Sequence, residues 1–193
     1  GLVRCYANSI CRDFDVALVR LPAVLKYHKI ESIIMVAKPL IDLDAIDLKA
    51  EVVSKKEILA LNAQRFEFEQ LDRVVYLDLE TLLAVGMKHQ AENEFWTRGH
   101  IPGRPIMPGV MMVEMAAQLC SIVFHKKLDT QGKVFFGFGG VNNVKFRGSV
   151  EPGTDLFMIA KGVSFRPRIA LFQVQGFANK KMVFEGEVTG VVV

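Results

Sequence analysis

The chain has 193 residues, of which 51% are hydrophobic, and its formal net charge is only +3. This length fits one domain with at most an appendage, and the apolar content is sufficient for a large core or a large interface. Because the charge is weak and no run of five or more Lys or Arg residues occurs, the composition argues against nucleic acid as a partner.

The cysteines and histidines point to a reducing compartment and to no metal site. The three cysteines, Cys5, Cys11 and Cys120, form no C-x-x-C spacing, so we expect free thiols in the cytoplasm. The four histidines share no zinc-like spacing with them. No apolar stretch approaches the ~20 residues of a membrane span, and charges interrupt the apolar stretches near the N-terminus, unlike a secretory signal.

The first part of the chain gives little indication of structure. A short helix around Asp15–Leu25, broken near Pro22, is the one element we predict there. Met35 is a candidate alternative translation start. Ser54–Leu61 is typical of a short helix, because Ser54 is a good N-cap and Glu57 stands at the third helical position.

A hairpin, a loop and a long apolar helix follow. Arg73–Glu80 and Thr81–Lys88 are predicted to be paired strands. The loop Asn93–Met107 is rich in Gly and Pro and carries His100. The helix Pro108–His125 is apolar on nearly every face, yet it contains Glu114 and Gln118 one turn apart. An ionised carboxylate in such a helix is costly unless it has a partner or a function.

The remainder of the chain is predicted to be β-structure. The expected strands are Lys133–Phe138, Val141–Phe146, Asp155–Phe165, Ile169–Ala178 and Met182–Val193. The run GFGG, Gly137–Gly140, suggests a bulge or kink in a long strand, and without GxGxxG spacing it is no dinucleotide fingerprint. These elements predict an α+β fold in which a curved antiparallel sheet wraps around one helix and a second copy closes its open side.

The residues around the long helix resemble a known family. The stretch GHIPGRPIMPGVMMVEMAAQ, Gly99–Gln118, resembles the FabZ-type (3R)-hydroxyacyl-acyl-carrier-protein dehydratases, which have a hotdog fold. The fourteen-residue interval from His100 to Glu114 is also that of the family. Weaker matches are Arg65–Val75, FWTRGH and Val144–Leu156. The resemblance divides the chain into an N-terminal extension, 1–50, of unassigned role and a hotdog dehydratase domain, 51–193.

Some positions depart from the family pattern near the entry segment. The usual P-H before Arg65 is Ala63-Gln64, and Glu67 replaces a proline. Glu69 and Gln70 replace apolar residues, and Ile101 replaces the phenylalanine after the histidine. These changes affect the expected chain-length preference but remove no catalytic group.

The resemblance implies a role for each site residue. His100 would be the base, Glu114 the acid or water-binding group, and the Gly109 amide the contact to the thioester carbonyl. The alternatives are a backbone-bonded loop histidine for His100, a structural carboxyl paired with an Arg for Glu114, and simple close packing for Gly109. Gln118 either holds the Glu114 carboxyl or caps a buried backbone group. Further residues assigned to substrate binding are Gln118, Val110, Met107 and Pro108.

The expected function is dehydration of (3R)-hydroxyacyl-acyl carrier protein to the trans-2-enoyl form in fatty acid biosynthesis, with no metal or cofactor. In the family, the histidine of one subunit faces the glutamate of the other, which implies a homodimer or a trimer of dimers. The acidic carrier protein would dock on basic residues. The candidates are Arg98, Arg104, Lys126, Lys127, Arg166 and Arg168.

Three alternative functions stay open at this point. A FabA-type dehydratase/isomerase carries Asp where this chain has Glu114, which argues against it. A hotdog thioesterase would not need the interval between His100 and Glu114. A non-catalytic subunit that binds acyl thioesters is the alternative from a different class of protein.

Overall fold

The computed structural model describes residues 38–193, which form one compact unit. The expected helix around Asp15–Leu25 and the candidate start Met35 lie outside the described residues. The helices are η1 (Leu43–Ala45), α1 (Lys55–Leu61), η2 (Phe66–Phe68) and α2 (Gly109–Leu128). The strands are β1 (Arg73–Asp78), β2 (Leu83–Gln90), β3 (Phe136–Phe146), β4 (Thr154–Arg166), β5 (Ile169–Ala178) and β6 (Lys181–Val192).

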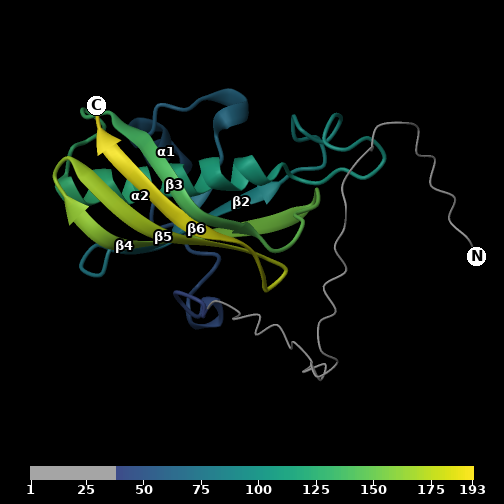
Figure 1. Cartoon of the computed structure of the whole chain (residues 1–193), viewed down its shortest axis with the longest axis horizontal. Helices are drawn as coiled ribbons and strands as arrows, with labels where there is room; N and C mark the ends of the chain where they lie inside the picture. The colour runs from purple at the N-terminus through teal and green to yellow at the C-terminus, as the bar shows by residue number, and fades with distance from the viewer. Residues whose placement is uncertain (1–37) are drawn as a thin grey trace, which may run out of the picture. The chain divides into compact units, whose positions relative to one another are not determined.

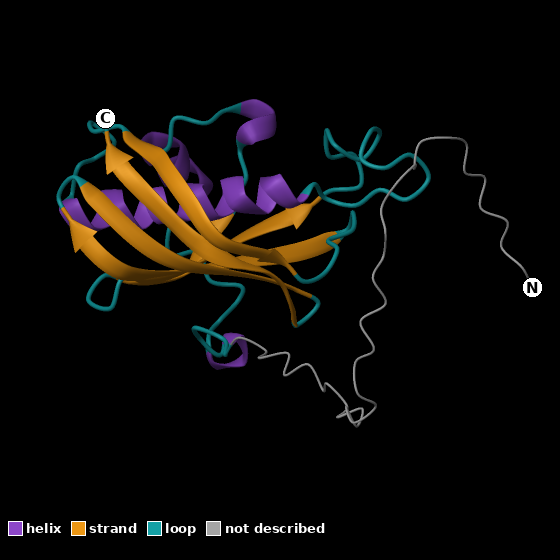
Figure 2. Cartoon of the chain, viewed as in Figure 1, coloured by secondary structure: helices purple, strands orange, loops and turns teal. Residues whose placement is uncertain are grey.

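The six strands form one antiparallel sheet in the order β1-β2-β4-β5-β6-β3. The sheet curves around α2, which lies along its concave face (Figure 1). The same view coloured by secondary structure shows one long helix, α2, against the orange sheet, with the short helix α1 beside it (Figure 2). The predicted α+β hotdog architecture is therefore confirmed.

One prediction about the strands was wrong. Lys133–Phe138 and Val141–Phe146 were expected as two strands, but the structure has a single strand, β3 (Phe136–Phe146), paired with β6. Its register shifts between Phe138 and Gly140 and again between Asn142 and Lys145. The glycine-rich run therefore bends a continuous strand, as the GFGG pattern suggested, because a bulge absorbs the extra residue without ending the ladder.

The inner core depends on a close approach between α2 and β2. A Cβ atom added at Gly86 would lie 2.6 Å from a methyl carbon of Leu71 and 3.1 Å from one of Leu119. Both leucines are fully buried. Glycine at this position therefore lets the helix lie closer to the sheet than any other residue would allow.

The outer face of the sheet has its own apolar cluster. Along β2, Leu83, Val85 and Met87 are buried on the outer side, while Ala84 faces the inner core. The residues 38–50, here called the cover segment, pack across this outer face with Leu40, Ile41, Leu43, Ile46 and Leu48. The sequence assigned residues 38–50 to an extension, whereas the compact unit begins at Lys38.

Polar contacts fix the cover segment to the sheet. The Gln175 side chain accepts a hydrogen bond from the Leu40 backbone N–H at 2.8 Å and donates to the Lys38 carbonyl at 3.1 Å. Lys180 forms an ion pair with Asp44 at 2.8 Å. The amide of Gln175 therefore replaces the strand partner that this part of the backbone lacks.

The start of α1 has the predicted capping box. Ser54 accepts a hydrogen bond from the Glu57 N–H, and the Glu57 side chain accepts one from the Ser54 N–H. The bond from the Ser54 backbone, followed by that from Lys126 on α2, lowers the pKa of Glu57 to about 2. These contacts position α1, and with it the turn that follows, beside α2.

We predict that Gly86→Ala destabilises the protein. The added methyl group has no space between Leu71 and Leu119, so the free energy of unfolding should fall by about 1–3 kcal/mol. Denaturant titration measures this change. Gly140→Ala is the matched control, because nothing lies within 4 Å of the Cβ it would add, and equal stability of the two variants would contradict the packing described here.

Candidate functional site

One face of α2 is left open by the sheet. Glu114, Ala117 and Ser121 recur at helical spacing and line a cleft of about 490 Å³. Val110, one turn before Glu114, is 69% exposed. The other walls of the cleft come from the turn after α1 and from the segment that leads into β3. The only carboxylate in α2 therefore faces a cavity and not the apolar core.

Two side-chain amides hold the Glu114 carboxyl. Gln64 donates to its Oε1 at 3.1 Å, and Gln118 donates to the same Oε1 at 2.8 Å. No arginine or lysine among the described residues forms an ion pair with Glu114. Within residues 38–193, Glu114 is therefore not a structural carboxylate paired with an arginine. Hydrogen bonds from neutral donors offset part of the cost of burial without requiring a second buried charge.

Gln118 both holds the Glu114 carboxyl and caps buried backbone groups, the two alternatives considered for it. Its Nε2 also donates to the Phe68 carbonyl at 2.6 Å, and its Oε1 accepts from the Gln70 backbone N–H at 3.0 Å. The amide thus caps two backbone groups of the segment around η2 and still contacts Glu114. Since the Gln70 N–H requires an oxygen opposite it, the amide group has only one acceptable orientation.

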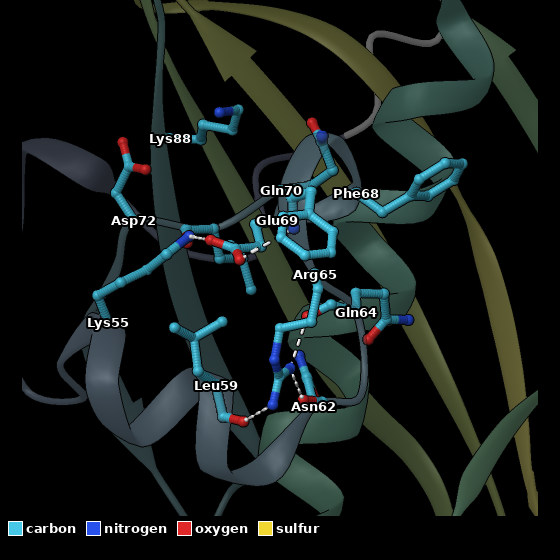
Figure 3. A network of polar contacts seen from close by, with 12 residues as sticks. Lys55, Leu59, Asn62, Gln64, Arg65, Phe68, Glu69, Gln70, Asp72 and Lys88 are labelled. Carbon is cyan, nitrogen blue, oxygen red and sulfur yellow. Dashed lines mark hydrogen bonds and ion pairs between the residues drawn. The ribbon is translucent and has the colours of Figure 1, made fainter.

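Arg65 fixes the turn that carries Gln64. Its guanidinium donates to the carbonyls of Leu59, Asn62 and Gln64 at 2.8, 2.8 and 2.6 Å. Figure 3 shows these bonds at the C-terminal end of α1. A cationic side chain at a helix C-terminus satisfies carbonyls that have no partner within the helix. Arg65 therefore binds backbone oxygens, and the hydrogen bonds to Glu114 come from the side-chain amides of Gln64 and Gln118.

His100 lies in the exposed loop before α2, which extends beyond the first turn of that helix in Figure 1. Its Nδ1 is 2.8 Å from the Ile106 carbonyl oxygen. A carbonyl only accepts, so Nδ1 carries the hydrogen, and in the neutral ring Nε2 carries a free lone pair. The backbone contact that was the alternative to a catalytic role is present, and it leaves the other nitrogen able to take up a proton.

A single chain does not bring all the predicted site residues together. His100, Gly109 and Val110 are absent from the lining of the cleft that contains Glu114. Met107 is 3% exposed and belongs to the inner core, so it presents no surface to a ligand. Pro108 is the N-cap of α2. The predicted site thus occupies two separate regions: the loop and helix start, and the cleft.

The start of α2 has free donors. Its N-cap is Pro108, and no side chain caps the first backbone N–H groups. Such groups, together with the helix dipole, favour a negatively charged oxygen. At Gly109, a Cβ would lie 2.8 Å from the Phe146 ring, so the close-packing alternative for this glycine also holds.

The part of the cleft towards the C-terminal end of α2 contains two titratable groups. Cys120 and His125 both line it. Burial raises the pKa of the Cys120 thiol and lowers the pKa of His125. His125 contacts the Thr130 hydroxyl at 2.5 Å. Both groups are therefore mainly uncharged near neutral pH, and the charged group that lines the cleft beside them is Lys133.

Gln64 was missed as a site residue, although the sequence contained a signal for it. It stands at the motif position where the resembled family has histidine. That polar position, next to an arginine, is the signal, whereas the sequence analysis names Gln64 only as a departure from the family pattern. Its contact with Glu114 joins positions 50 residues apart, and no local pattern in the sequence encodes that pairing.

The six basic candidates for docking lie in three pairs. Lys126 pairs with Glu57 at 3.0 Å, and Lys127 donates to the Leu79 carbonyl at 3.1 Å. Arg98 and Arg104 are exposed in the loop that carries His100. Arg166 and Arg168 lie at the turn between β4 and β5, beside the C-terminal end of the chain.

Residues 38–193 contain neither a membrane-spanning helix nor a cluster of metal ligands. No helix in residues 38–193 has the length and apolarity required to cross a bilayer. Within the same residues, no three His, Cys, Asp or Glu side chains gather closely enough to hold a metal ion.

Comparisons with known proteins agree on one family. The FabA-like domain model matches residues 62–187. A 3-hydroxyacyl-[acyl-carrier-protein] dehydratase FabZ from Desulfotalea psychrophila is 34% identical over 131 residues, covering 67% of this chain and 87% of that protein. The FabZ of Lawsonia intracellularis is 35% identical over 137 residues, covering 69% and 88%.

A solved structure supports the fold. The dehydratase heterocomplex ApeI:P from Xenorhabdus doucetiae has a TM-score of 0.59 with 11% identity, and the match covers 70% of this chain and 90% of that one. At this identity the likeness concerns the arrangement of the sheet and helix alone.

We predict that Gln118→Leu is strongly destabilising. The change leaves the buried Gln70 N–H and the Phe68 carbonyl without partners, so the free energy of unfolding should fall by about 2–4 kcal/mol. Thermal or denaturant unfolding measures the loss. An exposed glutamine on β5, Gln173, supplies the control Gln173→Leu, and a Gln118→Leu protein as stable as that control would show that these bonds contribute little.

Proposed function

We propose that this chain, which belongs to the FabZ-type dehydratase family and carries its FabA-like domain, is a hydro-lyase of fatty acid biosynthesis. It converts (3R)-hydroxyacyl thioesters on acyl carrier protein into trans-2-enoyl thioesters. The observation that carries this proposal is the arrangement of two proton-transfer groups. His100 has its Nε2 free of hydrogen bonds within residues 38–193, and Glu114 is held in a cleft by neutral donors.

The chemistry follows from the two groups. His100 Nε2 takes the proton from C2, and the electron pair forms the C2–C3 double bond. Glu114 gives its proton to the hydroxyl on C3, which leaves as water. The uncapped N–H groups at Gly109 and Val110 stabilise the charge that develops on the thioester oxygen. Atoms and charge balance, because the proton gained by His100 equals the one lost by Glu114.

A second copy of the chain completes the site. The histidine and the glutamate lie in separate regions of one chain, so they act together only if one region belongs to a partner. β3 is an edge strand, and it presents exposed apolar residues. Those residues are Phe138, Val141 and Phe146, with Ile101 and Val110 exposed on the loop and on α2. Exposed apolar side chains beside an unpaired strand edge favour association.

The proposed assembly is therefore a homodimer with two composite sites, in which the open face of α2 is covered by the second copy. A trimer of such dimers is the larger assembly that the resemblance to the family allows. At the opposite edge of the sheet, β1 is bridged by Val53, which makes that edge the weaker candidate for pairing.

Arg98 and Arg104 are the proposed docking residues for the acidic carrier protein. Both are exposed in the loop that carries His100, so a carrier bound there would deliver its acyl group near the base. Lys126 and Lys127 are less suited to this role, because both already have partners in the chain.

A hydration assay tests the proposed activity. Purified protein is given trans-2-enoyl thioesters of increasing chain length, on carrier protein and on a small thiol. We expect the near-ultraviolet absorbance of the conjugated thioester to fall without release of free thiol. Release of thiol would identify a thioesterase. No reaction with any substrate, together with tight binding of acyl carrier protein, would identify a non-catalytic subunit.

Two variants serve as controls in this assay. His100→Ala and Glu114→Gln should each lose activity by about 100-fold to 10,000-fold, because each removes a proton-transfer group. Both should remain folded, since the His100 ring is exposed and glutamine keeps the shape of Glu114. Near-native turnover in either variant would remove that residue from the mechanism.

The composite site makes a separate prediction about mixed dimers. If His100→Ala and Glu114→Gln chains are unfolded together and refolded at equal amounts, half of the dimers are mixed, and each mixed dimer has one intact site. We therefore expect about a quarter of native activity from two inactive proteins. A mixture as inactive as its components would show that both groups act within one chain.

A further inference from the structure

We propose that Gln64 is a positioning residue for Glu114, and that it selects which carboxyl oxygen meets the substrate. The inference rests on the proposed function of Glu114 as the acid. Gln64 and Gln118 both donate to Oε1, at 3.1 and 2.8 Å. Among the described residues, no hydrogen bond reaches Oε2. The two amides thus divide the carboxyl group into an anchored oxygen and a free one.

This division determines where the acid proton is carried. An oxygen that accepts two N–H groups has no lone pair directed at the substrate, and a hydrogen on it would face the donors. The proton of the acid form therefore resides on Oε2. Since Glu114 lines the cleft, Oε2 is the atom that protonates the leaving hydroxyl.

The two glutamines contribute differently. Gln118 is buried and makes two backbone contacts besides the one to Glu114, so it also stabilises the fold. Gln64 is half-buried, and within residues 38–193 its side chain makes one hydrogen bond, the one to Glu114. Gln64 is therefore the residue whose removal should alter the geometry of the acid while leaving the fold intact.

The position of Gln64 is determined by the turn after α1. Arg65 holds the Gln64 carbonyl at 2.6 Å and the carbonyls of Leu59 and Asn62 beside it (Figure 3). The Asn62 side chain also donates to the carbonyl of Gln118 at 3.1 Å, which ties the turn to α2. The backbone of Gln64 is thus fixed relative to Glu114, and the amide needs little ordering to reach it.

The chemical nature of Gln64 is also informative. The resembled family has histidine at this position, whereas an amide does not titrate. The cationic group nearest in sequence, Arg65, is directed at backbone carbonyls. His125 and Lys133 also line the cleft. An amide at position 64 therefore supplies Oε1 with a donor whose charge stays zero at every pH.

The test compares substitutions of Gln64 in the full chain, with the hydration assay run at about pH 8, where an imidazole is neutral. Gln64→Met keeps the length of the side chain and removes the donor. We expect kcat to fall by about 10-fold, with KM within about twofold and an unchanged unfolding midpoint. Gln64→His restores an N–H donor and should recover most of the lost kcat.

Control variants decide between positioning and general disturbance. Gln173→Met makes the same chemical change at an exposed site on β5 and should behave as the native protein. Native kcat in Gln64→Met, or an equal loss in Gln64→Met and Gln64→His, would overturn the proposal. If Gln64→Met failed to fold, Gln64→Glu would replace it, because its carboxylate repels Glu114 and should lower kcat below that of Gln64→His.

Failure of this proposal is distinguishable from failure of the proposed function. An active native protein that loses activity in His100→Ala, combined with an unaffected Gln64→Met, would contradict the role of Gln64 alone. A native protein without hydration activity would contradict the proposed function itself. A fall in kcat restricted to the Gln64 variants that lack a donor supports both.

Discussion

The enclosure of α2 is the constraint on which the rest of the structure depends. A helix of twenty residues with eleven of them buried has almost no face suited to water. The sheet curves around it, and Gly86 removes a side chain so that the helix can approach. What the sheet leaves open becomes the cleft, and exposed apolar residues lie around that opening, where the proposed second copy would cover them. The fold of the sheet and the position of the cleft therefore have one cause.

Glu114 shows how a carboxyl group is tolerated in such a helix. A buried ion pair would have compensated its charge but would also have favoured the ionised form at every relevant pH. Here two neutral amides donate to one carboxyl oxygen instead, so no second buried charge is needed. The arginine that is close in sequence, Arg65, is occupied by three backbone carbonyls. Arg65 and Glu114 therefore have separate hydrogen-bond partners, although they lie close to the same turn.

The sequence predicted the elements with strong local signals. The capping box of α1, the apolar helix and the hairpin of β1 and β2 are where they were expected, because each depends on residues close in the chain. β3 was divided wrongly, since glycines in a strand resemble a turn until the partner strand is known. The contact of Gln64 with Glu114 and the orientation of the Gln118 amide were beyond prediction, because tertiary packing alone creates them.

The cover segment has a consequence for how the domain is delimited. The family match begins at residue 62, and the motifs that carry the resemblance also lie after residue 50. Yet Leu83, Val85 and Met87 of β2 turn their side chains away from α2, and residues 38–50 pack over the apolar cluster to which they belong. A protein trimmed to the matched region would keep the proposed site residues His100 and Glu114 and expose an apolar strip on the outer face of its sheet. Exposed apolar strips favour self-association. The compact unit, which begins at Lys38, therefore starts well before the region that the family model matches.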